Sequence, residues 1–169
     1  MSPYASFFVV RGCNMEKIVT TEYLAKMDNL MPLIRETLDA GKSVAFSPRG
    51  VSMKPMLRQG IDSVVLSPLH GKLRKYDIPL YRYPSGKYIL HRIVDVKEDH
   101  YICLGDNTYT YETVQPDYLI AVVTAFKRGD KTISVQSPVY RLYCRLWVGA
   151  YPLRKFAKRA IGWIRRHLK

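Results

Sequence analysis

The alternation of apolar and polar positions changes its period twice along the chain. Between residues 31 and 41, apolar side chains recur at three- and four-residue steps. This predicts a helix that Pro32 begins and Gly41 ends, after a shorter helix that starts near residues 20–24. From residue 43 the period is two and turn residues come at short intervals. This part predicts about seven short strands, at 43–46, 63–66, 78–83, 88–96, 101–104, 118–127 and 132–135. Such close spacing favours a mainly β fold with antiparallel pairing.

Beyond Pro138 the helical period returns. Residues 141–150 predict one helix, and Pro152 sits where another can begin. The apolar positions of that second helix are Leu153, Phe156, Ala157, Ala160, Ile161, Ile164 and Leu168, with Trp163 at their margin. Basic residues cover its other sides. We therefore divide the chain into an N-terminal extension with a helix that packs on the core (1–42), a β domain (43–137) and a basic amphipathic helical tail (138–169).

Composition narrows the class of protein. The chain has 169 residues, 47% of them hydrophobic and 24% charged, which suits a globular domain with a real core. Its three cysteines are far apart and form no CxxC pair, so we expect no disulfide framework, no metal site and no cofactor. Cys103 is predicted to be a small core residue. No run of eighteen apolar residues exists to span a membrane. Residues 1–14 differ in character from the segment after them, and Met15 would make a natural start, so we interpret them either as a loose extension or as lying upstream of the true start.

The positive charge is concentrated in the tail. The net charge is +13, and residues 139–169 contain nine of the 27 lysines and arginines but no acidic residue. The remaining 18 basic residues face 14 acidic ones, so the rest of the chain has a net charge of only +4. A basic tail indicates an anionic partner, which can be lipid headgroups, nucleic acid or an acidic protein face.

Three polar islands carry the candidate chemistry. Ser52 lies in the stretch 48–57, between Gly50, which permits unusual backbone angles, and Pro55, which fixes its own φ, so this stretch predicts a stiff turn. His91 interrupts an apolar strand, and Asp106 follows another strand. Serine, histidine and aspartate are the three members of a nucleophilic triad. Taken singly, each also has a plain structural interpretation, as a turn serine, a core histidine and a turn-forming aspartate.

The order of these motifs resembles a known family. Gly50-x-Ser52-Met53-x-Pro55-x-Leu57-x-x-Gly60 is followed by Asp77-Ile78, His91-Arg92-Ile93 and Gly105-Asp106-Asn107. This series resembles the signal-peptidase-like serine peptidases, a superfamily that also contains the LexA-type self-cleaving repressors, over residues 43–127. The resemblance implies their antiparallel β domain, here with an N-terminal helix and C-terminal amphipathic helices. In the family's turn before the second motif a glycine stands where this chain has Tyr76.

The resemblance also implies roles for the site residues. Ser52 would be the nucleophile. His91 would be the general base, as in the archaeal and endoplasmic-reticulum signal peptidases, where histidine replaces the lysine of the bacterial enzymes. Asp106 would orient His91, and Glu112 lies near the place of a second acid that is usually aspartate. Asn107 would support the site, and Arg92 either pairs with a carboxylate such as Asp106 or Asp95 or is a surface charge.

The oxyanion hole is where the chain departs from this pattern. Many bacterial signal peptidases have a serine two residues before the nucleophile, whereas this chain has Gly50, which supplies no side-chain donor. The Ser52 backbone N–H is one expected donor, and a second must come from the backbone or elsewhere. We expect Met53 and Pro55 to contribute with Gly50 and Ser52 to binding the oxyanion and the substrate.

These observations predict a serine endopeptidase that cleaves an extended peptide or a leader or signal segment. Two alternatives stay open: a LexA-like regulator, although no helix-turn-helix domain or base lysine is present, and a non-catalytic peptide-binding module. For the tail, one interpretation is a tether to an anionic membrane through Leu153, Phe156, Ile161, Trp163 and Ile164. The other is that this apolar stripe packs on the β domain or covers the substrate groove. We expect a cytoplasmic, peripherally membrane-associated protein without a specific nucleic-acid partner.

Overall fold

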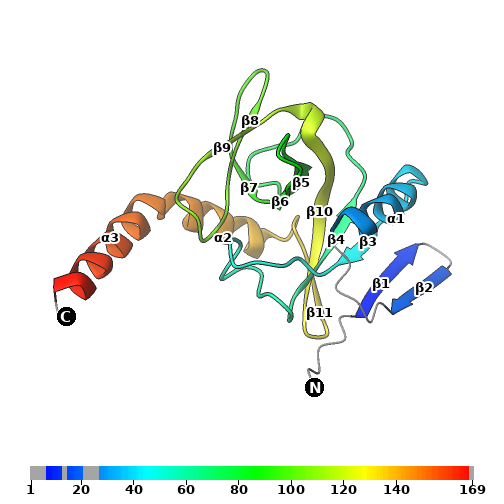
Figure 1. The fold of residues 1–169 in the computed structure, drawn as a ribbon, viewed down its shortest axis with the longest axis horizontal. Helices are drawn as coiled ribbons and strands as arrows, with labels where there is room; N and C mark the ends of the chain where they lie inside the picture. Colours follow the sequence, from blue (N-terminus) through cyan, green and yellow to red (C-terminus); the bar gives the residue numbers. More distant parts are fainter. Residues whose placement is uncertain (1–6, 13–14, 21–26, 168–169) are drawn as a thin grey trace.

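The computed structural model describes residues 7–12, 15–20 and 27–167 (Figure 1). This part of the chain is mainly β, with antiparallel sheets and a few helices. The strands are β1 (Phe7–Gly12), β2 (Met15–Thr20), β3 (Val44–Phe46), β4 (Ser63–Ser67), β5 (Pro79–Arg82), β6 (Tyr88–Leu90), β7 (Arg92–Val96), β8 (Tyr101–Leu104), β9 (Glu112–Val114), β10 (Leu119–Arg128) and β11 (Lys131–Ser134). The helices are α1 (Met27–Asp39), the 3-10 turn η1 (Pro116–Tyr118), α2 (Pro138–Gly149) and α3 (Tyr151–His167).

Two sheets carry the β domain. The larger follows the order β3-β4-β10-β5-β6, with β11 also paired to β10, and the smaller follows the order β7-β8-β9. All of these pairs are antiparallel. The ten-residue β10 pairs with β4, β5 and β11 along its length and forms the spine of the larger sheet. Strands occur at each of the positions that the period-two pattern predicts, and β1, β2 and β9 are additional strands that the sequence did not predict.

One predicted strand is in fact two. The pattern over 88–96 predicts a single strand, but β6 pairs with β5 in the larger sheet and β7 pairs with β8 in the smaller one. His91 lies at the break, where the chain passes from one sheet to the other. Periodicity cannot detect such a break because the alternation of apolar positions continues across it. The junction places His91 between the two sheets instead of within a ladder.

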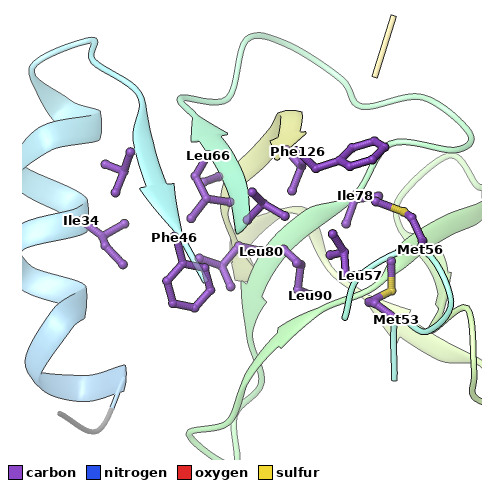
Figure 2. Packing of buried hydrophobic residues seen from close by; sticks show 14 of the residues in the cluster. Ile34, Phe46, Met53, Met56, Leu57, Leu66, Ile78, Leu80, Leu90 and Phe126 are labelled. Atoms are coloured by element: carbon purple, nitrogen blue, oxygen red, sulfur yellow. The ribbon is translucent and has the colours of Figure 1, made fainter. Parts of the chain in front are cut away.

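The main core joins the larger sheet to α1 and to the turn after β3. Met31, Ile34 and Leu38 of α1 are buried in it, as the helical period predicts. Figure 2 shows Ile34 and Phe46 on one side of this cluster and the labelled residues of the turn on the other. The helix starts at Met27, so the prediction that Pro32 begins it is wrong. Pro32 is exposed, and burial of the opposite face outweighs the one backbone hydrogen bond that proline removes.

Other expectations for the N-terminal part have different outcomes. The helix predicted to start near residues 20–24 lies mostly outside the described residues. Phe7–Gly12, within the segment interpreted as an extension, is a strand that pairs with β2. A smaller apolar cluster underlies the three-stranded sheet, and Cys103 is fully buried there as predicted.

The C-terminal helices differ from each other in how they pack. Tyr140 and Cys144 of α2 are buried in the main core, so the first part of the predicted tail packs with the β domain. By contrast, α3 extends away from the β domain (Figure 1). Its Leu153 and Phe156 are 72% and 71% exposed, and Trp163 is 58% exposed. The side chains of Leu153 and Phe156 are therefore largely open to solvent and are not covered by the β domain. The structure describes no helix with the length and apolarity needed to cross a bilayer.

Candidate active site

Ser52 lies in a series of turns anchored by the main core. The backbone N–H of Lys54 donates to Val51 O at 3.2 Å, and that of Leu57 donates to Met53 O at 2.9 Å. Met53, Met56 and Leu57 are buried, and Figure 2 shows all three pointing into the apolar cluster. The turn is therefore held from below by its apolar side chains, while Ser52 stays half-buried at the surface.

Gly50 has a structural reason to be glycine. Its φ is +102°, in a region that residues with a Cβ rarely adopt. Its N–H donates to Gln59 Oε1 at 3.0 Å, so Gly50 does not offer that group to an oxyanion. Within the described chain the N–H of Ser52 has no acceptor, which leaves it available. The expected donor at Ser52 is thus present, and Gly50 is not the second donor of an oxyanion hole.

His91 is held by a carboxylate from the neighbouring sheet. Its Nδ1 lies 2.6 Å from Oε2 of Glu112 on β9, and the same oxygen accepts a hydrogen bond from the Tyr81 hydroxyl on β5. The strand register explains the approach, because Glu112 pairs with Cys103 and Cys103 pairs with Ile93, two residues after His91. The sequence pattern predicts Glu112 only as a supporting residue near the site.

The surroundings of Glu112 determine its charge and the tautomer of His91. Burial alone would raise the pKa of Glu112, but the hydrogen bonds from His91 and Tyr81 outweigh it and lower the pKa. Burial and the hydrogen bond to Glu112 raise the pKa of Tyr81, so its hydroxyl stays protonated. An ionised carboxylate only accepts hydrogen bonds, so Nδ1 of a neutral His91 carries the proton and Nε2 is left as a base.

The Gly105-Asp106-Asn107 loop brings the serine turn and the histidine together. A Cβ placed on Gly105 would lie 2.8 Å from Ser52 O and 2.9 Å from His91 Nε2, so both atoms border the same small space. The Asn107 N–H donates to Ser52 O at 2.7 Å, and its side-chain amide donates to Val51 O at 3.2 Å. Through these two hydrogen bonds, Asn107 fixes the Ser52 turn against the loop.

Ser52 and His91 also line one surface pocket of about 160 Å³. Its other walls come from the segment before Ser52, from the buried side of the turn and from β6, through Pro48, Arg49, Gly50, Met53, Leu57, Gln59, Tyr88, Ile89 and Leu90. No hydrogen bond joins the Ser52 hydroxyl to His91 in the described residues. Such bonds are often long before substrate binds and tighten in the complex. Met53 lines this pocket, whereas Pro55, expected to contribute to the same binding, lines a different one between β10, β11 and α2.

Asp106 has a different partner from the one predicted. Both of its oxygens accept hydrogen bonds from Arg92, at 2.9 Å to Nε and 2.8 Å to Nη2, and both side chains are buried. The expectation that Asp106 orients His91 is therefore corrected, since Glu112 contacts that ring. The sequence left open whether Arg92 pairs with a carboxylate such as Asp106 or Asp95 or is a surface charge. In the structure it pairs with Asp106, whereas Asp95 pairs with Lys97.

Arg92 is the centre of a buried polar network. Nη1 donates to the Tyr140 hydroxyl at 2.8 Å and to Cys144 Sγ at 2.9 Å, and Nη2 donates to Met56 Sδ at 2.9 Å. Burial would lower the pKa of Arg92, but the hydrogen bonds to Asp106 outweigh it and raise the pKa, so the guanidinium is charged. The network ties the Asp106 loop, the end of the Ser52 turn and α2 into one unit.

Several residues that hold the candidate site in place were not predicted from the sequence. Tyr81, Gln59, Trp147 and Arg154 come from segments whose patterns predict only strand, turn or helix. The Trp147 indole N–H and Arg154 Nη1 both donate to the Asp106 carbonyl oxygen, at 3.2 Å and 2.7 Å. Tyr76 has a φ of +81°, a backbone conformation that residues other than glycine rarely adopt.

In the described part of the chain, no group of three or more histidine, cysteine or acidic residues is arranged to hold a metal ion. Searches against protein-family models, curated proteins and solved structures found no match for this chain.

Proposed function

We propose that the protein is a serine peptidase in which Ser52 is the nucleophile, His91 the general base and Glu112 the residue that orients His91. The observation that carries the proposal is the position of His91. Its Nδ1 is hydrogen-bonded to Glu112, while its Nε2 borders the space next to Ser52 in a pocket that both residues line. A serine hydroxyl needs a base of this kind to attack a carbonyl near neutral pH.

The residues have defined parts in the reaction. His91 Nε2 takes the proton of the Ser52 hydroxyl as Oγ bonds to the substrate carbonyl carbon, and the Ser52 N–H donates to the oxyanion. Collapse of this intermediate breaks the C–N bond, and His91 gives its proton to the leaving amine. A water molecule, activated by the same imidazole, then hydrolyses the ester on Ser52 and releases the acid product. Glu112 stabilises the imidazolium that forms in each half of the reaction.

The pocket favours a substrate bound as an extended strand. Three of the residues that line it form β6, which ends the strand order of the larger sheet. The edge of β6 that does not pair with β5 is therefore the place where a peptide can add by main-chain hydrogen bonds. We propose an extended segment, such as a leader or signal sequence, whose scissile bond lies between Ser52 and His91.

Asp106 and Arg92 have a supporting part in this proposal. They are buried and bonded to each other, and Asp106 belongs to the loop whose next residue donates to Ser52 O. Their function is to hold that loop, and through it the nucleophile turn, in place.

The test is labelling by a fluorophosphonate probe together with cleavage of a peptide library. Ser52→Ala should abolish both, and His91→Ala should slow both by at least about a hundredfold. Ser52 is half-buried and its hydroxyl has no partner in the described residues, so its removal should leave the fold intact. Ser85→Ala, in an exposed turn, and His100→Ala, outside the pocket, are matched controls.

Equal labelling and cleavage by wild type and Ser52→Ala would refute the assignment. If peptides bind and compete for the pocket but no variant is labelled or cleaves them, the protein is a peptide-binding module instead.

A further inference from the structure

The α2 and α3 helices have exposed apolar faces. On α2, Val139, Leu142 and Leu146 are each more than half exposed, and their three- and four-residue spacing puts them on one side of the helix. The buried Tyr140 and Cys144 occupy the other side. The exposed apolar residues thus extend beyond the α3 positions expected from the sequence. We define the outer face as Val139, Leu142 and Leu146 of α2 with Leu153 and Phe156 of α3.

The inner sides of these helices are fastened to the β domain. Arg154 bonds to the Asp106 carbonyl oxygen and stacks over Trp147, 4.1 Å from the ring centroid. The Tyr151 hydroxyl donates to Tyr109 O at 3.0 Å, and Lys158 Nζ lies 4.4 Å from the Tyr109 ring centroid. Because α2 and the first turns of α3 are anchored in this way, the outer face is part of the domain surface and points in a fixed direction.

Basic residues border the outer face. On a helix with 3.6 residues per turn, Arg145 lies beside the apolar row of α2 and Arg159 lies beside that of α3, while Arg141 and Lys155 lie farther round each helix. These four residues are exposed. No acidic residue occurs from 139 to 169, so every charged side chain that α2 and α3 bring to the outer face is positive.

The combination of an apolar row and a positive border selects among partners. A duplex nucleic acid offers phosphates but no apolar layer into which leucine and phenylalanine side chains can insert. A second copy of the chain would bring its own net charge of +13 against the same positive border. An anionic bilayer offers both a negative headgroup plane and an apolar layer just beneath it.

We propose that the outer face of α2 and α3 docks on an anionic phospholipid bilayer. The apolar residues enter the boundary between headgroups and acyl chains, and the bordering arginines and lysines meet the phosphates. This surface lies apart from the pocket that Ser52 and His91 line, so the proposal goes beyond the peptidase reaction and does not depend on it. It also means that the protein would act at a membrane surface, with its pocket in a fixed orientation to the lipid.

The test is co-sedimentation of the full chain with vesicles of phosphatidylcholine alone or mixed with phosphatidylglycerol. We expect wild type to pellet with the mixed vesicles, and pelleting to fall with added salt. The triple variant Leu146→Gln, Leu153→Gln, Phe156→Gln should weaken binding by roughly tenfold or more per residue. Since all three side chains are exposed, their replacement should not unfold the protein. Ile61→Gln, which is 64% exposed in a loop before β4, is the matched apolar control.

A second set tests the charge. Arg141→Gln, Arg145→Gln and Arg159→Gln together should lower binding to mixed vesicles roughly tenfold or more, while Lys42→Gln, Lys87→Gln and Lys131→Gln, which remove the same charge elsewhere, should lower it less. Equal binding by the apolar triple variant and Ile61→Gln would overturn the proposal. Failure of wild type to pellet with mixed vesicles would also overturn the proposal. In that case, binding of wild type to duplex DNA, or formation of dimers that the triple variant abolishes, would point to a different partner.

Discussion

Glu112 Oε2 lies 2.6 Å from His91 Nδ1, although Glu112 is on β9, His91 is at the break between β6 and β7, and the two are 21 positions apart in the chain. Two successive antiparallel pairings, β7 with β8 and β8 with β9, bring them together. The contact decides which nitrogen of His91 faces the Ser52 turn. It therefore also decides which acid should matter for catalysis.

Glu112→Gln should reduce kcat for peptide cleavage by about 10²- to 10⁴-fold with only a modest loss of stability at neutral pH, because an amide cannot hold the required tautomer or stabilise the imidazolium. Steady-state kinetics on a peptide substrate, with thermal melting alongside, measures both effects. Glu98→Gln, an exposed glutamate in a turn, is the control. A loss of activity in the control as large as in Glu112→Gln would contradict this role.

Gly105→Ala should disrupt the site because there is no room for a Cβ. That atom would lie 2.8 Å from Ser52 O, 2.9 Å from His91 Nε2 and 2.9 Å from Thr108 Cγ2, so the turn or the ring must move. We expect a loss of stability of about 1–3 kcal/mol and a loss of activity of about a hundredfold or more. Gly149→Ala is the matched control, since no atom lies within 4 Å of a Cβ there. Normal activity and stability of Gly105→Ala would refute the close approach.

Asp106→Ala should lower the free energy of unfolding by about 3–5 kcal/mol, because it leaves the buried Arg92 guanidinium without its carboxylate. Urea denaturation followed by circular dichroism measures this difference. Asp95→Ala, which breaks the exposed pair with Lys97, should cost no more than about 1 kcal/mol. If Asp106→Ala were as stable as Asp95→Ala, the buried network would not be what holds the loop.

The lowered pKa of Glu112 predicts a dependence of stability on acid. Although burial opposes it, hydrogen bonds from His91 and Tyr81 bring this pKa below the ordinary value of 4.5. A carboxyl whose pKa is lower in the folded state stabilises the fold above its unfolded pKa, and the contribution disappears as the pH falls through the folded value. The stability advantage of wild type over Glu112→Gln should therefore shrink as the pH falls below about 4.5.

The same argument predicts that Tyr81→Phe, which removes one of the two hydrogen bonds, moves the pKa of Glu112 upward. An NMR titration of the side-chain carboxyl measures this directly. An unchanged pKa in Tyr81→Phe would show that the tyrosine does not stabilise the charged form.

Arg154→Ala should loosen the Asp106 loop, since it removes the donor 2.7 Å from the Asp106 carbonyl oxygen. The Asn107 amide, which donates to Ser52 O, should exchange its hydrogen roughly tenfold faster. Hydrogen-exchange NMR checks this, with Arg159→Ala as an exposed control on the same helix. Equal protection of Asn107 in the two variants would mean that α3 does not stabilise the loop.

The sequence by itself determined most of the element order and the candidate residues. Period-two and helical patterns report which side of a local element is buried, and so they predicted most strands, α2 and the apolar face of α1. The motifs around Ser52, His91 and Asp106 predicted which side chains to examine, because glycine, proline and polar residues inside apolar runs mark unusual local structure.

Only the tertiary structure decided the partners. Whether His91 meets Asp106 or Glu112 depends on strand order and register, which join residues that no local pattern connects. The break at His91 lies where the two halves of one apolar run pair with different sheets, β6 with β5 and β7 with β8. Whether the apolar stripe of α3 is covered depends on what surrounds the helix. The amphipathic sequence pattern is the same whether the stripe is buried or exposed. Local patterns fix what each segment can bury, whereas packing in three dimensions fixes what it meets.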